Sequence, residues 1–197
     1  MPKAAKPCRR HNGRERVRQA IFSLPVLAGL LVLPTGAHGQ FVLTLVEQTV
    51  AAQLPVANMD WRELQHGLAS PDSGRFLIFD VRDRDEYDVS HLPHARHVDP
   101  RLSAEDFIKQ FGDSLRERRV VFYCSVGYRS SLLLQRLQKD LHTAGCRAAA
   151  NLRGGIFRWY NEGNPVVNAA GPAQRVHPYD RFWGLLLRNK GRSAPEE

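Results

Sequence analysis

Residues 120–130 carry the most informative pattern of the chain, Val120-Val121-Phe122-Tyr123-Cys124-Ser125-Val126-Gly127-Tyr128-Arg129-Ser130. The apolar run before the cysteine indicates a buried strand, and the leucine-rich residues 132–141 indicate a helix. A thiol at such a strand-to-helix turn is a candidate nucleophile, because the unpaired N–H groups and the dipole at a helix start stabilise a thiolate. Gly127 suits a loop folded around an anion, and Arg129 adds a full positive charge. The alternative is an inert buried cysteine that ends a core strand.

Apolar strands alternate with helices along the surrounding chain. Asp60 and Ser103 have the residue types that cap helices, and the helix predicted after Ser103 covers residues 104–115. Such alternation predicts an α/β fold whose mainly parallel sheet carries helices on both faces. With 197 residues, 43% of them hydrophobic, the chain can bury one ordinary core, which favours a single domain. In parallel sheets ligands bind at the carboxyl ends of strands, where Cys124 is expected.

Two further blocks extend the pattern in both directions along the chain. The first is the strand-like run Phe76-Leu77-Ile78-Phe79-Asp80-Val81-Arg82, followed by Glu86-Tyr87 and by His91-Leu92-Pro93-His94-Ala95. The second is Asn151-Leu152-Arg153-Gly154-Gly155, followed by Trp159, Gly163 and Pro165. In this order and spacing, the three blocks resemble the signatures of the rhodanese (sulfurtransferase) family over residues 60–168.

This resemblance implies transfer of sulfane sulfur through a persulfide on Cys124, without a cofactor. An anionic, thiosulfate-like donor would supply the sulfur, and a thiophilic acceptor such as cyanide or a thiol would remove it. The loop that holds the negative charge would comprise Ser125, Val126, Gly127, Tyr128, Arg129 and Ser130, with Arg129 orienting the donor. Asp80, Arg82 and Glu86 would support the site, and the resemblance suggests an ion pair between Arg82 and Glu86.

Three positions depart from the family pattern. Ser90 and His94 stand where the family commonly has glycine, which concerns the local turns and not the reacting thiol. Ser125 stands where some thiosulfate-using members carry a basic residue, so the natural donor stays open.

Two other functional classes compete with sulfur transfer. Some phosphatases and arsenate reductases share this fold and its cysteine and arginine, but the resemblance implies that their loop is one residue longer. Here four residues separate Cys124 from Arg129, a tighter loop that favours a single sulfur atom over a tetrahedral oxyanion. A non-catalytic module that binds or carries sulfur is the other alternative.

The charge of the chain is concentrated at its start. The net charge is +8, but residues 1–39 contain seven basic residues and one acidic residue, which leaves +2 for the remainder and no case for nucleic-acid binding. The uncharged run at 21–33 would reach roughly 20 Å as a helix, short of the ~30 Å hydrocarbon core of a membrane. With Ala37-His38-Gly39 behind it, this run predicts a cleaved export signal and a periplasmic protein. A membrane anchor over residues 21–46 and a cytosolic protein are the alternatives.

These patterns divide the chain into an export signal (1–39), an N-terminal extension (40–55), a rhodanese-like domain (56–168) and a tail (169–197). Within the tail, the spacing of Tyr179, Phe182, Trp183 and Leu186 predicts a short amphipathic helix over residues 178–188. We expect its aromatic face to pack on the domain. Because basic residues follow, contact with a partner or a membrane surface through this helix is the alternative.

The remaining cysteines and histidines point to no metal. Beyond the leader, Cys124 is accompanied only by Cys146, which we interpret as a small residue packed at a strand edge. A redox or resolving role for Cys146 is the alternative, and a disulfide between the two would block the proposed chemistry. His91 and His94 lack a recognised zinc spacing and are interpreted as turn or core residues.

Overall fold

A computed structural model describes residues 35–188, which fall within one compact unit that begins at Pro34. Its helices are α2 (Thr35–Gln53), α3 (Trp61–Ala69), η2 (Pro71–Arg75), α4 (Arg84–Val89), α5 (Ala104–Leu115), α6 (Tyr128–Thr143), α7 (Gly155–Asn161) and η3 (Trp183–Leu186), where η marks a 3-10 helix. Its strands are β1 (Asn58–Met59), β2 (Phe76–Asp80), β3 (Arg96–His97), β4 (Arg119–Tyr123), β5 (Ala148–Leu152), β6 (Val166–Asn168) and β7 (Gly171–Ala173).

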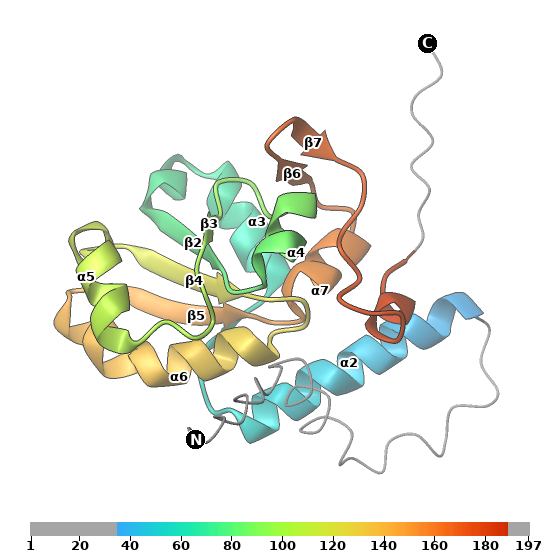
Figure 1. The fold of residues 1–197 in the computed structure, drawn as a ribbon, viewed down its shortest axis with the longest axis horizontal. Coiled ribbons are helices and arrows are strands. Elements are labelled where there is room, and N and C mark those ends of the chain that lie inside the picture. The colour runs from blue at the N-terminus through green and yellow to red at the C-terminus, as the bar shows by residue number, and fades with distance from the viewer. Residues whose placement is uncertain (1–34, 189–197) are drawn as a thin grey trace, which may run out of the picture. The chain divides into compact units, whose positions relative to one another are not determined.

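The main sheet has five parallel strands in the order β1-β5-β4-β2-β3 (Figure 1). β4 is the central strand, paired with β2 on one side and with β5 on the other. β6 and β7 form a separate antiparallel hairpin. The predicted α/β fold with a parallel sheet is confirmed, and the end of β4 places Cys124 at the middle of the carboxyl edge of the sheet.

Helices cover both faces of this sheet (Figure 1). One face packs against α5 and α6 in an apolar cluster that includes Phe79, Phe107 and Phe122. Alternate residues of β2 and β4 belong to this cluster, so Ile78 and Val121 between them point to the other face. The predicted caps are also confirmed, since Asp60 accepts from the N–H of Arg62 and Ser103 from that of Asp106.

Helix α2 covers most of the segment expected to be an N-terminal extension. Its Leu43 and Val50 are buried, and its polar side docks on Arg158 of α7. Glu47 accepts from Arg158 Nε at 2.7 Å, and Thr44 accepts from Arg158 Nη2 at 2.9 Å. This helix is therefore a packed part of the same unit as the sheet. In the described part of the chain, no helix is both long enough and apolar enough to traverse a lipid bilayer.

The C-terminal tail differs from the predicted helix over residues 178–188. Only the single turn η3 is helical, because Tyr179 lies in the left-handed region with φ of 66° and interrupts any earlier helix. Asp180 begins η3 by accepting from the N–H groups of Phe182 and Trp183. The expected packing onto the domain is confirmed for Trp183 and Leu186, which are buried, whereas Phe182 is 40% exposed.

Candidate active site

Cys124 directly follows β4, and the loop after it leads into α6. The cysteine is only 1% exposed, and the backbone N–H of Gly127 donates to its Sγ at 3.2 Å. Gly127 has φ of 97° and forms the N-cap of α6, a backbone conformation that glycine adopts without strain. The loop therefore turns back so that the Gly127 N–H points towards the sulfur.

The start of α6 supplies more donors around the same place. The N–H groups in the first turn of any helix have no acceptor within that helix, and here the turn contains Tyr128, Arg129 and Ser130. The carbonyl of Gly127 accepts from both the N–H and the hydroxyl of Ser131, at 3.1 and 2.8 Å, which fixes the N-terminus of the helix. A negative charge on the sulfur would thus face the positive end of the α6 dipole.

Gly155, at the start of α7, allows this helix to pack directly against the Cys124 loop. Ile156 and Phe157 of α7 donate their N–H groups to the carbonyls of Cys124 and Ser125, at 2.9 and 3.1 Å. A Cβ atom at Gly155 would lie only 2.1 Å from the carbonyl oxygen of Cys124. The close contact of α7 with the loop therefore requires glycine at this position.

Arg129 lies beside the loop and pairs with acidic residues from the start of α4. Its Nη1 and Nη2 donate to the carboxylate of Glu86 at 2.8 and 3.0 Å, and Nη1 also lies 3.5 Å from Asp83 Oδ2. Ser125 Oγ accepts from Nη2 at 3.1 Å and donates to Glu86 at 2.9 Å. Sequence reasoning expected the guanidinium to orient a donor, yet its terminal nitrogens are engaged by the protein itself.

The electrostatic interactions in this cluster favour the charged forms of Glu86 and Arg129. Burial by itself would raise the pKa of Glu86, but its hydrogen bonds and its attraction to Arg129 outweigh burial and lower it. Burial by itself would lower the pKa of Arg129. The hydrogen bonds and the charge of Glu86 outweigh burial and raise the pKa of the guanidinium. The negative charge of a Cys124 thiolate acts in the same direction on Arg129, so thiolate and guanidinium attract each other.

The suggested ion pair between Arg82 and Glu86 is wrong. Arg82 pairs with Asp80 through Nε at 3.0 Å and Nη2 at 2.7 Å, and Nη2 also donates to the carbonyl of Ser90 at 2.6 Å. Asp80 accepts in addition from the Tyr123 hydroxyl at 2.7 Å. The reason is local, because Asp80 ends β2 two residues before Arg82, whereas Glu86 on α4 turns towards the Cys124 loop.

This second cluster is fully buried. Burial would lower the pKa of Arg82, but the charge of Asp80 outweighs it and raises that pKa. Burial together with Asp80 raises the pKa of Tyr123 well above its usual value. The cluster of Asp80, Arg82 and Tyr123 therefore stabilises the end of β2.

Two asparagines that support the site, Asn58 and Asn151, were not predicted as site residues. Asn151 accepts from the Ser130 hydroxyl at 2.7 Å and donates to Asn58 on β1 at 2.8 Å. The hydroxyl of Ser130 is therefore used for support and does not face the sulfur. Asn151 begins the second block of the family pattern, so the sequence marked this residue. Its contact with Ser130 could not be predicted, because it depends on the register of β5 beside β4.

A contact from the far end of the chain also reaches the site. The ring of Tyr179 covers the Arg129 guanidinium, with Cζ 5.0 Å from the ring centre. The sequence predicted that the aromatic residues of the tail would pack on the domain. The helical periodicity of the tail could not show that Tyr179 contacts Arg129.

The histidines of the first block take part in local structure. His91 stacks on Tyr87, and its Nδ1 lies 3.0 Å from the Tyr87 carbonyl. Exposed His94 has φ of 62° at a position where the family commonly has glycine. Within residues 35–188, no group of three or more His, Cys, Asp or Glu side chains is arranged to hold a metal ion.

Cys146 lies at the opposite end of the sheet from Cys124. It precedes β5, whose first residue Ala148 pairs with Arg119 at the start of β4. Cys124 follows the last residue of β4, so strand geometry separates the two cysteines by about 20 Å, far beyond the roughly 7 Å limit between Cα atoms of a disulfide. Burial raises the pKa of the Cys146 thiol, and the fold keeps it away from the reaction.

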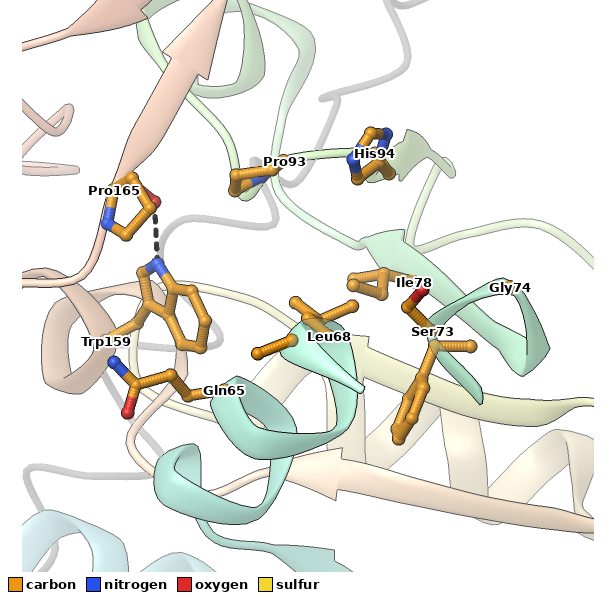
Figure 2. A pocket seen from close by; sticks show the side chains of 11 residues that line it. Gln65, Leu68, Ser73, Gly74, Ile78, Pro93, His94, Trp159 and Pro165 are labelled. Atoms are coloured by element: carbon orange, nitrogen blue, oxygen red, sulfur yellow. Dashed lines mark hydrogen bonds between the residues drawn. The ribbon is translucent and has the colours of Figure 1, made fainter. Parts of the chain in front are cut away.

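A cavity of about 670 Å³ lies apart from the cysteine loop (Figure 2). Its walls come from α3, η2, β2 and the turn at Pro93 and His94, with Trp159 and Pro165 at one end. Most of these side chains are apolar, and the indole of Trp159 donates to the Pro165 carbonyl at 2.8 Å. None of the residues of the Cys124 loop lines this cavity, so the chemistry expected of the thiol takes place elsewhere.

Comparison with known proteins shows which proteins the chain resembles. The family model described as a rhodanese-like domain matches residues 61–162. A probable molybdopterin-synthase adenylyltransferase of Porphyra purpurea is 30% identical over 132 residues, which cover 63% of this chain and 32% of that protein. A tRNA uridine(34) hydroxylase of Nitrobacter hamburgensis is 33% identical over 127 residues, which cover 60% of this chain and 43% of that protein. The chain thus spans less than half the length of these curated relatives.

Among solved structures, a thiosulfate sulfurtransferase from Pseudomonas aeruginosa superposes with a TM-score of 0.50 at 21% identity. The superposition covers 75% of this chain and 26% of that one. At this identity the likeness concerns the fold alone, and it agrees with the α/β architecture described above.

Proposed function

The chain belongs to the family of rhodanese-like domains, and from this premise we propose that it is a sulfurtransferase that carries sulfane sulfur on Cys124. The observation that carries the proposal is the hydrogen bond from the Gly127 N–H to the Cys124 Sγ. It places the sulfur within a loop that leads into the start of α6, where helix N–H groups lack an intrahelical acceptor and can bind negative charge. Such a loop stabilises both the thiolate and the persulfide anion.

The reaction proceeds in two displacements that leave no net oxidation. The Cys124 thiolate attacks the sulfane sulfur of the donor and forms a new S–S bond. With thiosulfate as donor, the bond between its two sulfur atoms breaks, and sulfite leaves with the electron pair. Cyanide or a thiolate then attacks the outer sulfur of the persulfide, so that the Cys124 thiolate leaves and is regenerated.

We assign Arg129 a positioning role in this reaction. Through Glu86 and Ser125, its guanidinium connects α4 to the loop next to the cysteine. Its positive charge lies close enough to attract a Cys124 thiolate. The donor itself would be held by backbone N–H groups, which suit a single sulfur atom between Cys124 and the first turn of α6.

Thiocyanate formation from thiosulfate and cyanide tests the proposal. We expect turnover by the unaltered protein and none by Cys124→Ser. Cys146→Ser is the matched control, because it removes the other thiol of the described chain without touching the loop. Full activity of Cys124→Ser, or loss of activity in Cys146→Ser alone, would contradict the assignment. A protein that loads sulfur but does not release it to cyanide would instead support the non-catalytic carrier.

A further inference from the structure

The C-terminal segment passes along the side of the active site. After β7 the chain runs past α7 to η3 (Figure 1), and on the way Tyr179 places its ring over Arg129. The segment is held on both sides of this contact. Before it, the Tyr160 hydroxyl donates to the Gln174 carbonyl at 2.8 Å. After it, Asn161 donates to the Leu186 carbonyl at 2.7 Å. Both anchoring side chains belong to α7.

Tyr179 reaches this position in an unfavourable backbone conformation. Its φ of 66° lies in the left-handed region, which is strained for a bulky aromatic residue. The N–H of Tyr179 donates to His177 Nδ1 at 3.0 Å and helps to hold the turn. Strained conformations persist where surrounding contacts impose them, and they concentrate at functional sites.

The Tyr179 ring adds to the burial of the Arg129 guanidinium, which already contacts two acidic residues. The Arg129 nitrogens Nη1 and Nη2 are bonded to Glu86, Asp83 and Ser125. Tyr179 covers a face of the same guanidinium. The Arg129 side chain is only 11% exposed. An anion that approaches Cys124 therefore meets a guanidinium whose terminal nitrogens are hydrogen-bonded within the protein and one face of which lies under the Tyr179 ring.

We propose that Tyr179 is a specificity-determining residue that shields Arg129, so that the Cys124 site favours uncharged sulfur donors over small anions. The inference rests on the proposed function for the identity of the reacting thiol. It concerns the chemistry of the donor, which Ser125 leaves open because it stands where some thiosulfate-using members of the family carry a basic residue.

Alkylation of Cys124 by iodoacetate and by iodoacetamide tests the shield, because these reagents differ mainly by one negative charge. Tyr179→Gly removes the ring, and glycine accepts the observed φ, so this variant should fold. We expect the ratio of the iodoacetate rate to the iodoacetamide rate at Cys124 to rise about fivefold, the effect of one newly exposed charge near the reaction in water. The increase should shrink in 0.5 M salt, as roughly expected for an exposed charge.

Three controls separate shielding from loosening of the tail. Tyr179→Phe keeps the ring and should keep the ratio of the unaltered protein. Phe182→Ala removes an aromatic side chain that is 40% exposed in the same segment, and it should also leave the ratio unchanged. Cys146, measured in the same digests, reports general unfolding. Equal acceleration of both reagents in Tyr179→Gly, or no acceleration of either, would overturn the proposal.

The alkylation result is independent of sulfur transfer, since alkylation requires a reactive Cys124 thiolate and no sulfur donor. If no persulfide forms in the unaltered protein, the proposed function fails while the rate ratio still decides the role of Tyr179. If sulfur transfer does occur, Tyr179→Gly should lower the KM for thiosulfate severalfold with kcat nearly constant. An unchanged KM would contradict the inference even where the function holds.

Discussion

Glu86 connects parts of the site that are distant in the sequence. Its carboxylate accepts from Arg129 and Ser125 of the cysteine loop and from the backbone N–H of Asp83, at 3.1 Å for the last. The side chain is 1% exposed, so its charge depends on these partners and not on water. At the residue scale, this carboxylate fixes the position of the arginine that supports the thiol.

Glu86→Gln should destabilise the protein by about 3 kcal/mol, because removal of one member of a buried ion pair leaves the other charge uncompensated. Urea denaturation measures this loss. Asp88→Asn is the matched control, since Asp88 forms an ion pair with Arg84 in which both side chains are mostly exposed, and such exposed pairs contribute little to stability. Equal effects of the two substitutions would show that the Glu86 pair adds no special stability.

The lowered pKa of Glu86 also predicts how stability depends on pH. Because the folded pKa lies below the ordinary value of 4.5, the unfolded chain takes up the proton first as the solution becomes acidic. The stabilisation is therefore complete above pH 4.5 and decreases as pH falls through the lowered folded pKa. The unaltered protein should lose more unfolding free energy than Glu86→Gln between pH 5 and pH 3, and parallel curves would contradict this.

At the scale of elements, the loop between β4 and α6 determines which group can bind. Four residues separate Cys124 from Arg129, and one backbone N–H already points at the sulfur. A phosphoryl group needs donors around three oxygens, whereas a persulfide adds one atom.

The protein should therefore not hydrolyse aryl phosphates, and a glycine inserted after Gly127 should weaken sulfur transfer by widening the loop. Phosphate release from an aryl phosphate and thiocyanate formation measure the two activities side by side. Phosphatase activity of the unaltered protein that disappears in Cys124→Ser would instead support the rival class of enzyme.

The sequence predicted the elements more completely than the contacts between them. The strand before Cys124 and the helix after it follow from apolar runs, and Ser103 marks the start of α5. The partner of Arg82 could not be chosen, because Asp80 and Glu86 are both near it in sequence and only the direction of α4 separates them. The tail helix was predicted too long, because periodicity does not register the left-handed backbone at Tyr179.

At the scale of the whole molecule, the predicted export signal sets where the mature chain begins. The predicted cleavage after Gly39 falls within α2, and the leader before residue 35 lies outside the described residues. The described contacts of α2 with Arg158 begin at Gln40, so cleavage would leave them all in the mature protein.

N-terminal sequencing of protein from an exporting host should therefore read Gln40-Phe41-Val42. Recovery of the full-length chain in the membrane fraction would favour the anchor over residues 21–46. Unprocessed soluble chain in the cytosol would exclude both.

The intact mass of the protein tests the central claim most directly. Treatment with thiosulfate should add about 32 Da, the mass of one sulfur atom in a persulfide, and cyanide should remove it. Cys146→Ser should gain and lose the same mass, whereas Cys124→Ser should gain none. An adduct that persists in Cys124→Ser, or no adduct on the unaltered protein even with thiosulfate in large excess, would contradict a persulfide on Cys124.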